Sequence, residues 1–432
     1  MKKVKGIKIP HSKNTAFSLP RQLPVPAQVR LPMTMHSGAP ARPIVKQGDH
    51  VKVGQMIAEA IGAVSSPVHA SVSGTIKSIL DFDPLTGQKE TSIVIESDGE
   101  QSIYEGLSIP SAENLDEFLD GVSKSGVVGL GGAGFPAAPK LNIGKEKHLD
   151  FLLINGAECE PYITSDTRIM VDQGEDVFSG SMLIKKFLKP VQTYICIEDN
   201  KAEAINKLKE LCKNVDGIDV KILPTRFPQG ERKILVYNVT GRVVPEGARL
   251  HDVGCLVTNC STAALIGNFF KTGMPLCSRI VTVDGSAVKE AQNVIAPIGT
   301  AIGELFDFCG GFKEEPGKII MGGPMMGRAV MSLDLPVVKT TNSILAINKK
   351  DSKETKESPC IKCGRCTRNC LMHLMPSFIE EAVALRNTDL LKKYKIDLCA
   401  ECGTCAYLCP SKRKLSQVMV LAKKLLREDA RK

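Results

Sequence analysis

Two copies of one cysteine spacing near the C-terminus constrain the fold of this chain more than any other sequence feature. Each copy reads CxxCxxCxxxC; the first begins at Cys360 and the second at Cys399. This spacing holds [4Fe–4S] clusters: three closely spaced thiolates surround one cluster, and the fourth cysteine reaches the neighbouring one. We therefore expect a small, helical C-terminal domain, ferredoxin-like in its spacing, with two adjacent clusters arranged for electron hopping.

The crossed ligand pattern divides the cysteines of the two runs into two sets. The first set is Cys360, Cys363, Cys366 and Cys409, and the second set is Cys399, Cys402, Cys405 and Cys370. Pro410 follows the second run as usual, but Leu371 stands at that position in the first run, which is expected to alter one cluster's surroundings without removing a ligand. Two structural zinc sites are the alternative, although zinc sites usually have longer loops between their cysteine pairs.

The length and composition indicate a soluble protein of several domains. A chain of 432 residues with 43% apolar and 24% charged residues is typical of a multidomain globular protein. No apolar stretch reaches the ~18–20 residues of a transmembrane helix, and the basic start of the chain lacks the apolar region of a secretory signal. We therefore expect a cytoplasmic protein that contacts a membrane at most peripherally, on the cytoplasmic face of the inner membrane.

The charge and the cysteine content narrow the possible partners. A formal charge of +9 favours acidic partners, and fifteen cysteines in a cytoplasmic chain favour metal or redox chemistry over disulfides. Nucleic acid is disfavoured, because tryptophan is absent, aromatic residues make up only 5% of the chain, and the basic residues are scattered.

The residue pattern predicts a multidomain protein of mixed α/β and α+β class. The expected parts are an N-terminal arm (1–30), a barrel-sandwich β module (31–108), a Rossmann-like α/β domain (109–245), a linker segment with a small β-grasp domain (246–348), a charged linker (349–358) and the two-cluster domain (359–432). The β module resembles biotinyl and lipoyl carrier domains. No lysine lies between Lys52 and Lys77, where the carrier hairpin would be, so we expect a structural module.

A glycine-rich loop, Gly129-Leu-Gly-Gly-Ala-Gly-Phe-Pro136, follows a strand-like run and precedes a predicted helix. Glycines let backbone N–H groups approach a phosphate or a flat ring, and a helix N-terminus favours an anion. The loop lacks the GxGxxG spacing of dinucleotide-binding folds. On its own it is equally consistent with a tight turn.

Two further motifs give this loop a context. The run from Gly131 to Pro136 with Lys140, followed by Asn155-Gly-Ala-Glu-Cys-Glu-Pro161, resembles the FMN- and NADH-binding subunit of respiratory complex I. The resemblance to the C subunit of the Rnf electron-transport complex is closer and covers nearly the whole chain. It includes Arg226–Glu231, Val239–Pro245, Met321–Gly327 and the paired cysteine runs.

The resemblance implies a flavin site and a nicotinamide site. On the flavin side, the glycine loop and Lys140 would line the FMN phosphate and ring, Asn155 and Glu158 would hydrogen-bond the flavin, and Glu231 would support it. Thr258, Asn259 and Thr262 would lie near the phosphate. Phe135 would stack on the nicotinamide ring, and Glu160 would accept hydrogen bonds from ribose hydroxyls of NAD(H). The loop glycines assigned in this way are Gly129, Gly131, Gly132 and Gly134.

Three departures from the family pattern point to a paralogue. A single glycine, Gly230, precedes Glu231 where the family has two. The run Asn259-Cys-Ser-Thr262 replaces Asn-Val-Gly-Thr, and the usual Gly-Gly-x-His-Pro start is reduced to Gly6-Ile-Lys-Ile-Pro-His11. These changes favour a soluble relative, such as the electron-transfer protein associated with clostridial proline reductase. Cys260, introduced beside the expected flavin site, is a candidate redox thiol; its alternative is a small buried core residue.

The resemblance implies an NADH-dependent oxidoreductase subunit. NADH would pass a hydride to FMN, and electrons would leave singly through the two clusters to a redox partner, either Rnf-type membrane subunits or a soluble reductase such as proline reductase. The direction of flow stays open. The alternative is an electron-transfer adaptor that carries clusters but has no NADH chemistry. The amphipathic stretch 411–432 is expected to pack on the two-cluster domain or to dock on anionic lipid or an acidic partner.

Overall fold

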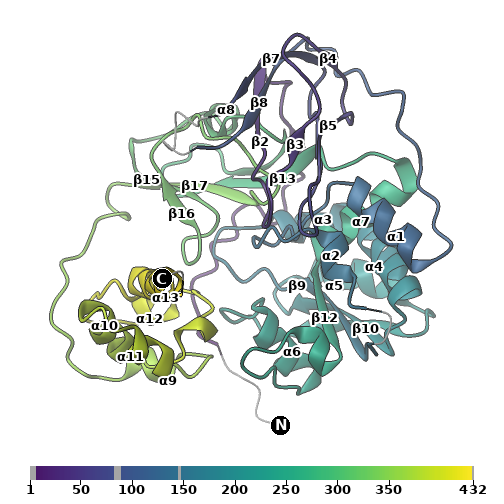
Figure 1. Cartoon of the computed structure of the whole chain (residues 1–432). Coiled ribbons are helices and arrows are strands. Elements are labelled where there is room, and N and C mark those ends of the chain that lie inside the picture. The colour runs from purple at the N-terminus through teal and green to yellow at the C-terminus, as the bar shows by residue number, and fades with distance from the viewer. Residues whose placement is uncertain (1–5, 82–88, 145–146, 431–432) are drawn as a thin grey trace.

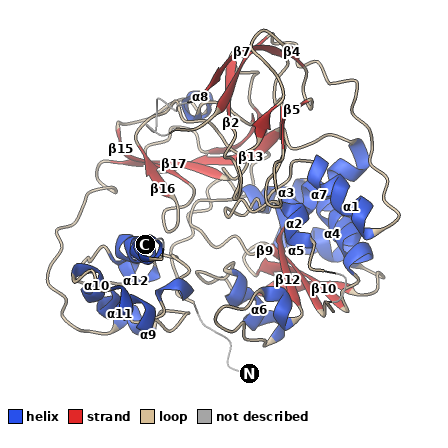
Figure 2. Ribbon diagram, in the orientation of Figure 1, coloured by secondary structure: helices blue, strands red, loops and turns tan. Residues whose placement is uncertain are grey.

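The computed structural model describes residues 6–81, 89–144 and 147–430. Figure 1 shows a β-rich module at one end, an α/β domain beside a mixed sheet, and a helical C-terminal domain on a long connection. Figure 2 shows that the strands lie in the first three parts and that the C-terminal domain is built of helices and loops. The described residues contain no helix with the length and apolar character that a bilayer crossing requires.

The N-terminal β module consists of two small antiparallel sheets that face each other. One sheet has the order β2 (Gln28–Pro32), β8 (Ser92–Ser97), β7 (Gly74–Leu80) and β4 (His50–Val51). The other sheet has the order β3 (Arg42–Pro43), β5 (Met56–Glu59) and β6 (Val68–His69). Along β7, buried and exposed residues alternate at first, as expected for a strand with one face on a core. The barrel-sandwich prediction is confirmed.

The α/β domain is a parallel sheet in the order β11 (Ile218–Leu223), β10 (Gln192–Glu198), β9 (Phe151–Gly156) and β12 (Cys255–Asn259). Its helices are α1 (Leu115–Lys124), α2 (Ala137–Leu141), α3 (Ser165–Asp172), α4 (Gly174–Leu188), α5 (Ala202–Cys212), α6 (Arg232–Thr240) and α7 (Cys260–Thr272). Leu152, Leu153 and Ile154 are completely buried, as in strands covered on both faces.

The strand order places a switch point at β9. The chain leaves β9 toward β10 on one side, and β12 pairs with β9 on the other side. Ligands of open α/β sheets bind at such a point, beyond the carboxyl ends of the strands. In the register of the two strands, Asn155 of β9 lies opposite Asn259 of β12, so two predicted site residues stand at this edge.

The mixed sheet has the order β1 (Arg21–Gln22), β14 (Gln292–Pro297), β13 (Ser278–Asp284), β17 (Ser343–Asn348), β15 (Pro316–Met321) and β16 (Arg328–Val330). Helix α8 (Ile302–Phe308) packs on this sheet, and a 3-10 turn (Leu250–Val253) precedes β12. The expected N-terminal arm is not wholly irregular, because β1 pairs in parallel with Val294–Ile295.

The C-terminal domain contains α9 (Arg365–Arg368), α10 (Pro376–Ala384), α11 (Thr388–Lys393), a 3-10 turn (Ile396–Leu398), α12 (Thr404–Tyr407) and α13 (Leu415–Asp429). The apolar side of α13 contributes Met419 and Leu426 to the core of this domain. Lys423 donates to the carbonyl of Cys399, so part of the basic side also binds within the domain. The amphipathic C-terminal helix therefore packs on its own domain.

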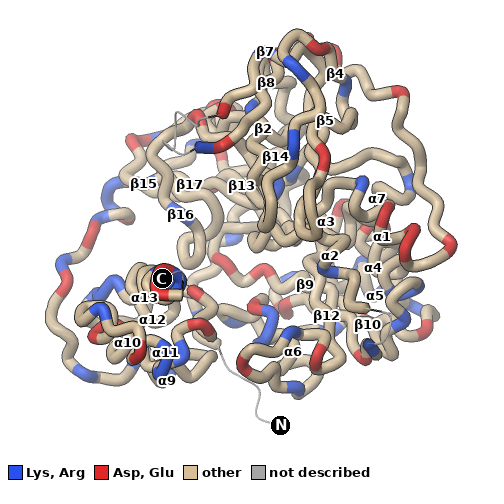
Figure 3. Tube along the Cα trace, in the orientation of Figure 1, with Lys and Arg blue, Asp and Glu red and all other residues tan. Residues whose placement is uncertain are grey.

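The N-terminal segment runs between the C-terminal domain and the α/β domain (Figure 1). Ile7 bridges to Phe227, and Ile9 lies in one apolar group with Phe227 and Cys159. Figure 3 shows lysine and arginine interspersed with acidic residues over all parts of the chain, rather than gathered on one face.

Candidate functional site

The glycine loop is closed by its own backbone and held by α7. Gly129 N donates to Phe135 O at 2.8 Å, and Gly134 N donates to Gly129 O at 3.1 Å. The strand predicted before the loop is absent from the described structure: Val128 forms only an isolated bridge with Pro136, because the chain turns back on itself there. The exposed tip of the loop, residues 131–133, faces solvent.

Thr262 and Asn259 join the loop to the N-terminus of α7. The Thr262 hydroxyl accepts from Leu130 N at 3.0 Å and donates to Val128 O at 3.1 Å. Asn259 caps α7 by accepting from the backbone N–H of Ser261 at 3.0 Å, and a side chain at Gly131 would come within 3.2 Å of Asn259 Nδ2. The loop therefore lies directly on a capped helix N-terminus, a favourable position for an anion.

Two of the residues predicted to bind the phosphate, Thr258 and Lys140, have polar groups available to a ligand. The Thr258 hydroxyl is buried and has no hydrogen-bond partner within the described part of the chain. Lys140, on α2, forms no ion pair there either, and burial together with the nearby Arg232 lowers its pKa to about 8. A free hydroxyl and an excess of positive charge suit a phosphate. These residues fit FMN in the way the sequence predicted.

Asn155 binds the turn that leads into Glu231. Asn155 Nδ2 donates to Gly230 O at 3.0 Å, and the Glu231 carboxylate caps α6 by accepting from Ile234 N at 2.9 Å. A side chain at position 230 would come within 2.5 Å of Ala157 O. Gly230 therefore lets the turn pack closely against Ala157 while its carbonyl accepts the hydrogen bond from Asn155.

The Glu158 carboxylate forms hydrogen bonds and an ion pair with other residues of the protein. Its buried carboxylate accepts from Asp166 N at 2.8 Å and from the Thr167 hydroxyl at 2.6 Å. Lys201 Nζ lies 3.7 Å from it, and burial raises its pKa against the opposing charges of Lys13 and Lys201. The carboxylate holds the start of α3 in place, beside the predicted flavin position.

Lys13 is a site residue that the sequence did not indicate. Its ammonium group donates to the carbonyls of Glu158 at 2.9 Å, Glu160 at 2.8 Å and Ile163 at 2.5 Å. Burial lowers its pKa to about 8. Nothing in the irregular N-terminal arm distinguishes this lysine from its neighbours, so no sequence signal could have found it.

Glu160 binds a loop of the mixed sheet. Its two oxygens accept from Met326 N at 2.7 Å and from Met325 N at 3.1 Å, and burial raises its pKa to about 7. Phe135 is 38% exposed, so its ring is accessible to a ligand. The motif Met321–Gly327 therefore lies against Glu160, one of the two residues predicted to face the dinucleotide.

Cys260 is completely buried at the first position of α7. Burial, with the charges of Asp166 and Glu158, raises the pKa of its thiol well above the usual value. A thiol that stays protonated is a poor nucleophile, so the geometry gives no support to the redox interpretation. The cysteines outside the two motifs are all buried: Cys159, Cys196, Cys212, Cys255, Cys260, Cys277 and Cys309.

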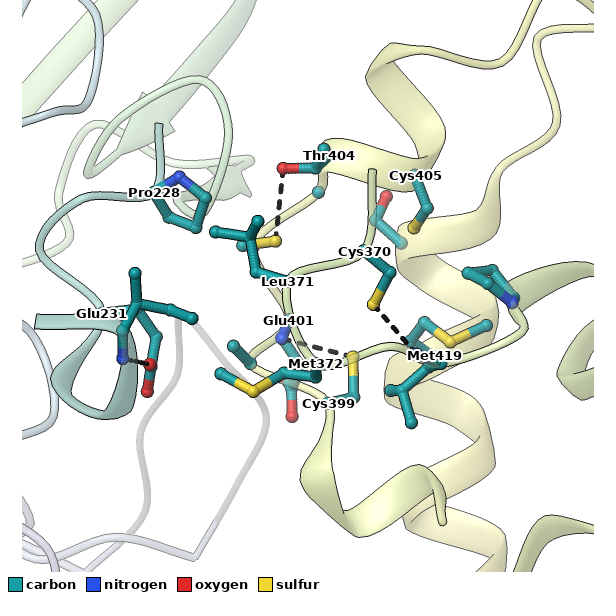
Figure 4. A pocket seen from close by; sticks show the side chains of 17 residues that line it. Pro228, Glu231, Cys370, Leu371, Met372, Cys399, Glu401, Thr404, Cys405 and Met419 are labelled. Carbon is teal, nitrogen blue, oxygen red and sulfur yellow. Dashed lines mark hydrogen bonds between the residues drawn. The ribbon is translucent and has the colours of Figure 1, made fainter. Parts of the chain in front are cut away.

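The four cysteines of the second set line one pocket (Figure 4), together with Pro228, Glu231 and Ile234 of the α/β domain. Leu374 N donates to Cys370 Sγ at 3.4 Å, and Glu401 N donates to Cys399 Sγ at 3.4 Å. Backbone N–H groups that donate to sulfur are among the contacts that set the potential of a thiolate-ligated cluster. The crossed assignment of Cys370 to the second set therefore fits this geometry.

Hydrogen bonds between neighbouring residues bring the two ends of the first cysteine set together. Ser411 accepts from Ser358 N at 3.1 Å and donates its hydroxyl to Pro359 O at 3.0 Å, which brings the segment after Cys409 next to Cys360. Throughout the described residues, no three metal-binding side chains are close enough to hold a single ion.

Family models match three segments of the chain. They describe an RnfC barrel sandwich hybrid domain at residues 1–100, a Nuo51 FMN-binding domain at 122–268 and an SLBB domain at 280–329. The C subunit of the proton-translocating ferredoxin:NAD(+) oxidoreductase complex of Clostridium ljungdahlii is 42% identical over 382 residues, covering 87% of this chain and 82% of that protein. This chain belongs to the Rnf C-subunit family.

Other members of the Rnf C-subunit family are similar over comparable lengths. The corresponding protein of the Na(+)-translocating complex of Acetobacterium woodii is 42% identical, over 87% of this chain and 86% of that protein. The corresponding protein of the ion-translocating oxidoreductase complex of Rhodobacter capsulatus is 39% identical, over 82% and 69%.

Two solved structures share the fold. They are NAD+-reducing [NiFe]-hydrogenase in its H2-reduced state (14% identity, TM-score 0.51) and in its air-oxidised state (17% identity, TM-score 0.52). Each match covers 74% of this chain, which spans 62% and 64% of those hydrogenase chains.

The Rnf C-subunit match confirms several predictions. The family and the multidomain fold are as expected, and so is the class of function: an electron-transfer oxidoreductase subunit with FMN, NAD(H) and iron–sulfur clusters. The roles of individual residues stay predictions, and so do the domain boundaries.

Proposed function

We propose that this chain transfers electrons between NAD(H) and a redox protein through FMN on the glycine loop and clusters on the two cysteine sets. The observation that carries the proposal is the turn Gly230–Glu231. On one side Gly230 accepts from Asn155, a predicted flavin residue, and on the other side Glu231 lines the pocket of the second cysteine set. One turn therefore lies between the two predicted redox sites.

FMN, when bound, supplies the conversion between two-electron transfer with NAD(H) and one-electron transfer with the clusters. The protein's own residues bind and position. The N-terminus of α7 and Lys140 provide positive charge for the phosphate, and Thr258 offers a free hydroxyl. The absence of side chains in the glycine loop lets a flat ring approach the backbone.

The partner is proposed to meet the first cysteine set. Cys360 is exposed, whereas the second set lies against the α/β domain. Near the first set, exposed cations have no ion-pair partner among the described residues; they are Lys362, Arg365, Arg368 and Lys412. Such a surface favours an acidic redox protein. Rnf-type membrane subunits and a soluble reductase both suit it; the first would place the chain peripherally on the cytoplasmic face of the inner membrane.

The second candidate is a cluster-bearing adaptor without NADH chemistry. The observation that favours it is Glu160, since both of its oxygens already bind backbone N–H groups of Met325 and Met326. In that case the glycine loop is structural.

An anaerobic absorbance titration with NADH tests the choice, using protein with reconstituted clusters and FMN. Bleaching of the flavin band followed by the cluster band supports the proposed path. If dithionite alone bleaches the protein and no flavin binds, the adaptor is correct. Lys140→Glu should abolish flavin binding with the clusters intact, because it reverses the charge beside the phosphate. Lys209→Glu, on the exposed side of α5, is the matched control.

A further inference from the structure

One loop of the mixed sheet touches both the predicted nicotinamide site and the second cysteine set. Met325 N and Met326 N donate to the Glu160 carboxylate at 3.1 and 2.7 Å. On its other side, Met325 O lies 2.7 Å from where a side chain at Gly403 would begin. Gly403 directly follows Cys402, so the backbone of Met325 lies between Glu160 and a predicted cluster ligand.

This contact is reinforced by side-chain packing. Met325 packs on an apolar group that contains Ile9, Phe227 and Cys159, together with Cys402. A change in the position of Met325 would therefore displace Cys402 as well. Interiors packed in this way transmit displacements because they contain few voids.

The loop is anchored as a unit. Gly322 N donates to Ser343 O at 2.8 Å, and Gly327 N donates to Gly323 O at 2.7 Å. A side chain at Gly323 would overlap the Glu160 carboxyl group, so only glycine permits this approach. Each Glu160 oxygen accepts one backbone N–H, so a further donor on this carboxylate would share an oxygen that the loop already binds.

We propose that the loop Met321–Gly327 couples occupation of the nicotinamide site to the second cluster, and that Met325 is the positioning residue of this coupling. The inference rests on the proposed function, in which Glu160 accepts hydrogen bonds from a ribose. Ribose hydroxyls on Glu160 would share its oxygens with the N–H groups of Met325 and Met326, which weakens these two hydrogen bonds. The loop then shifts, and its contact with the Cys402–Gly403 segment changes.

Coupling of this kind is reciprocal. If dinucleotide binding changes the surroundings of the second cluster, the redox state of that cluster changes the affinity for the dinucleotide by the same factor. A tenfold difference in affinity between the two redox states corresponds to a 59 mV shift in a one-electron potential. Met325 contacts Cys402 and Gly403 in the segment of the second set, so the first cluster is used as an internal reference.

The test is a redox titration of the full chain, with clusters and FMN reconstituted, followed by EPR. ADP-ribose is the probe, because it carries the ribose hydroxyls and cannot be reduced. We expect saturating ADP-ribose to shift the potential of one cluster, with a tenfold coupling giving 59 mV, and to leave the other cluster unchanged.

Two variants locate the coupling in the loop. Gly323→Ala should abolish the shift by displacing the loop from Glu160. Met325→Ala keeps the backbone donors but removes the packing on Cys402, and should reduce the shift while ADP-ribose still binds. Met331→Ala is the control, because Met331 is fully exposed on the same domain.

The outcomes separate the two proposals. If ADP-ribose binds, NADH bleaches the flavin, and neither cluster potential moves, the coupling is wrong and the proposed function stands. If Met325→Ala leaves the full shift in place, the loop does not carry it. If neither ADP-ribose nor NADH binds, the proposed function fails and the coupling fails with it.

Discussion

Thr262→Val should loosen the glycine loop and weaken flavin binding. In the described structure, the Thr262 hydroxyl is the partner of both Leu130 N and Val128 O, and it is buried. Valine has nearly the same shape but leaves both backbone groups unsatisfied. Each such group costs about 1–3 kcal/mol, so closing the loop becomes roughly 2–6 kcal/mol less favourable.

The predicted loss of loop stability can be measured at one backbone amide, the N–H of Leu130. At the lower limit of about 2 kcal/mol, the N–H of Leu130 should exchange with solvent roughly thirtyfold faster, because each 1.4 kcal/mol is a factor of ten. FMN must then order the loop as it binds, so its dissociation constant should rise at least about tenfold. Hydrogen exchange and flavin fluorescence measure the two effects.

A matched substitution separates the hydrogen bonds from the change of residue type. Thr193, on β10 of the same domain, is buried, and its hydroxyl has no partner among the described residues, so Thr193→Val should alter neither quantity. If Thr262→Val leaves both the exchange of Leu130 and the FMN affinity unchanged, α7 does not hold the loop. If Thr193→Val produces the same loss, the effect does not arise from the two hydrogen bonds.

Three further measurements test separate parts of the structure. Thr258→Val should weaken FMN binding without lowering the stability of the flavin-free protein, since its buried hydroxyl has no partner to lose within the described chain; calorimetry and flavin fluorescence would distinguish the two. Burial lowers the pKa of Lys339 to about 7. Above that pH, the Lys339 side chain holds one proton fewer in the folded chain than in the unfolded chain. The free energy of unfolding should therefore rise by roughly 1.4 kcal/mol per pH unit, up to the ordinary lysine pKa. Lys339→Met should lack this slope in urea titrations, and equal slopes would refute the assignment. Arg368→Glu with Lys412→Glu should slow association with an acidic two-cluster ferredoxin about tenfold at low salt, whereas Lys393→Glu on α11 should not; an unchanged rate in stopped-flow would remove the proposed docking surface.

The position of Cys370 beside the second cysteine run followed from the spacing rule, whereas the assignment of the cluster ligands stays a prediction. Within each run, the spacing determines how three thiolates surround a cluster, and the crossing of the fourth follows from the same rule. The structure brings Cys370 to the pocket of Cys399, Cys402 and Cys405, as that rule requires. The glycine loop and the run Asn259-Cys-Ser-Thr262 were likewise visible in the sequence.

The contacts that complete the site were not predictable. Lys13 is 145 residues from Glu158, and Met325 is 165 residues from Glu160. A lysine in an irregular arm and a methionine in a turn carry no periodicity or spacing that indicates a distant partner. The burial of Cys260 could not be predicted for the same reason, because the core that surrounds it comes from other segments of the chain.

These long-range contacts indicate that the redox sites depend on the whole chain. The residues around Met325 come from four parts: Ile9 from the N-terminal segment, Phe227 from the α/β domain, Met325 from the mixed sheet and Cys402 from the C-terminal domain. The segment 122–268, which matches the FMN-binding domain model, contains Glu160 but lacks Lys13 and Met325. That segment alone would leave the carbonyl of Glu160 without the ammonium of Lys13 and its carboxylate without the backbone donors. The N-terminal segment and the mixed sheet therefore contribute contacts to the predicted site: Lys13 binds the carbonyl of Glu160, and the Met325 backbone lies between the Glu160 carboxylate and Gly403.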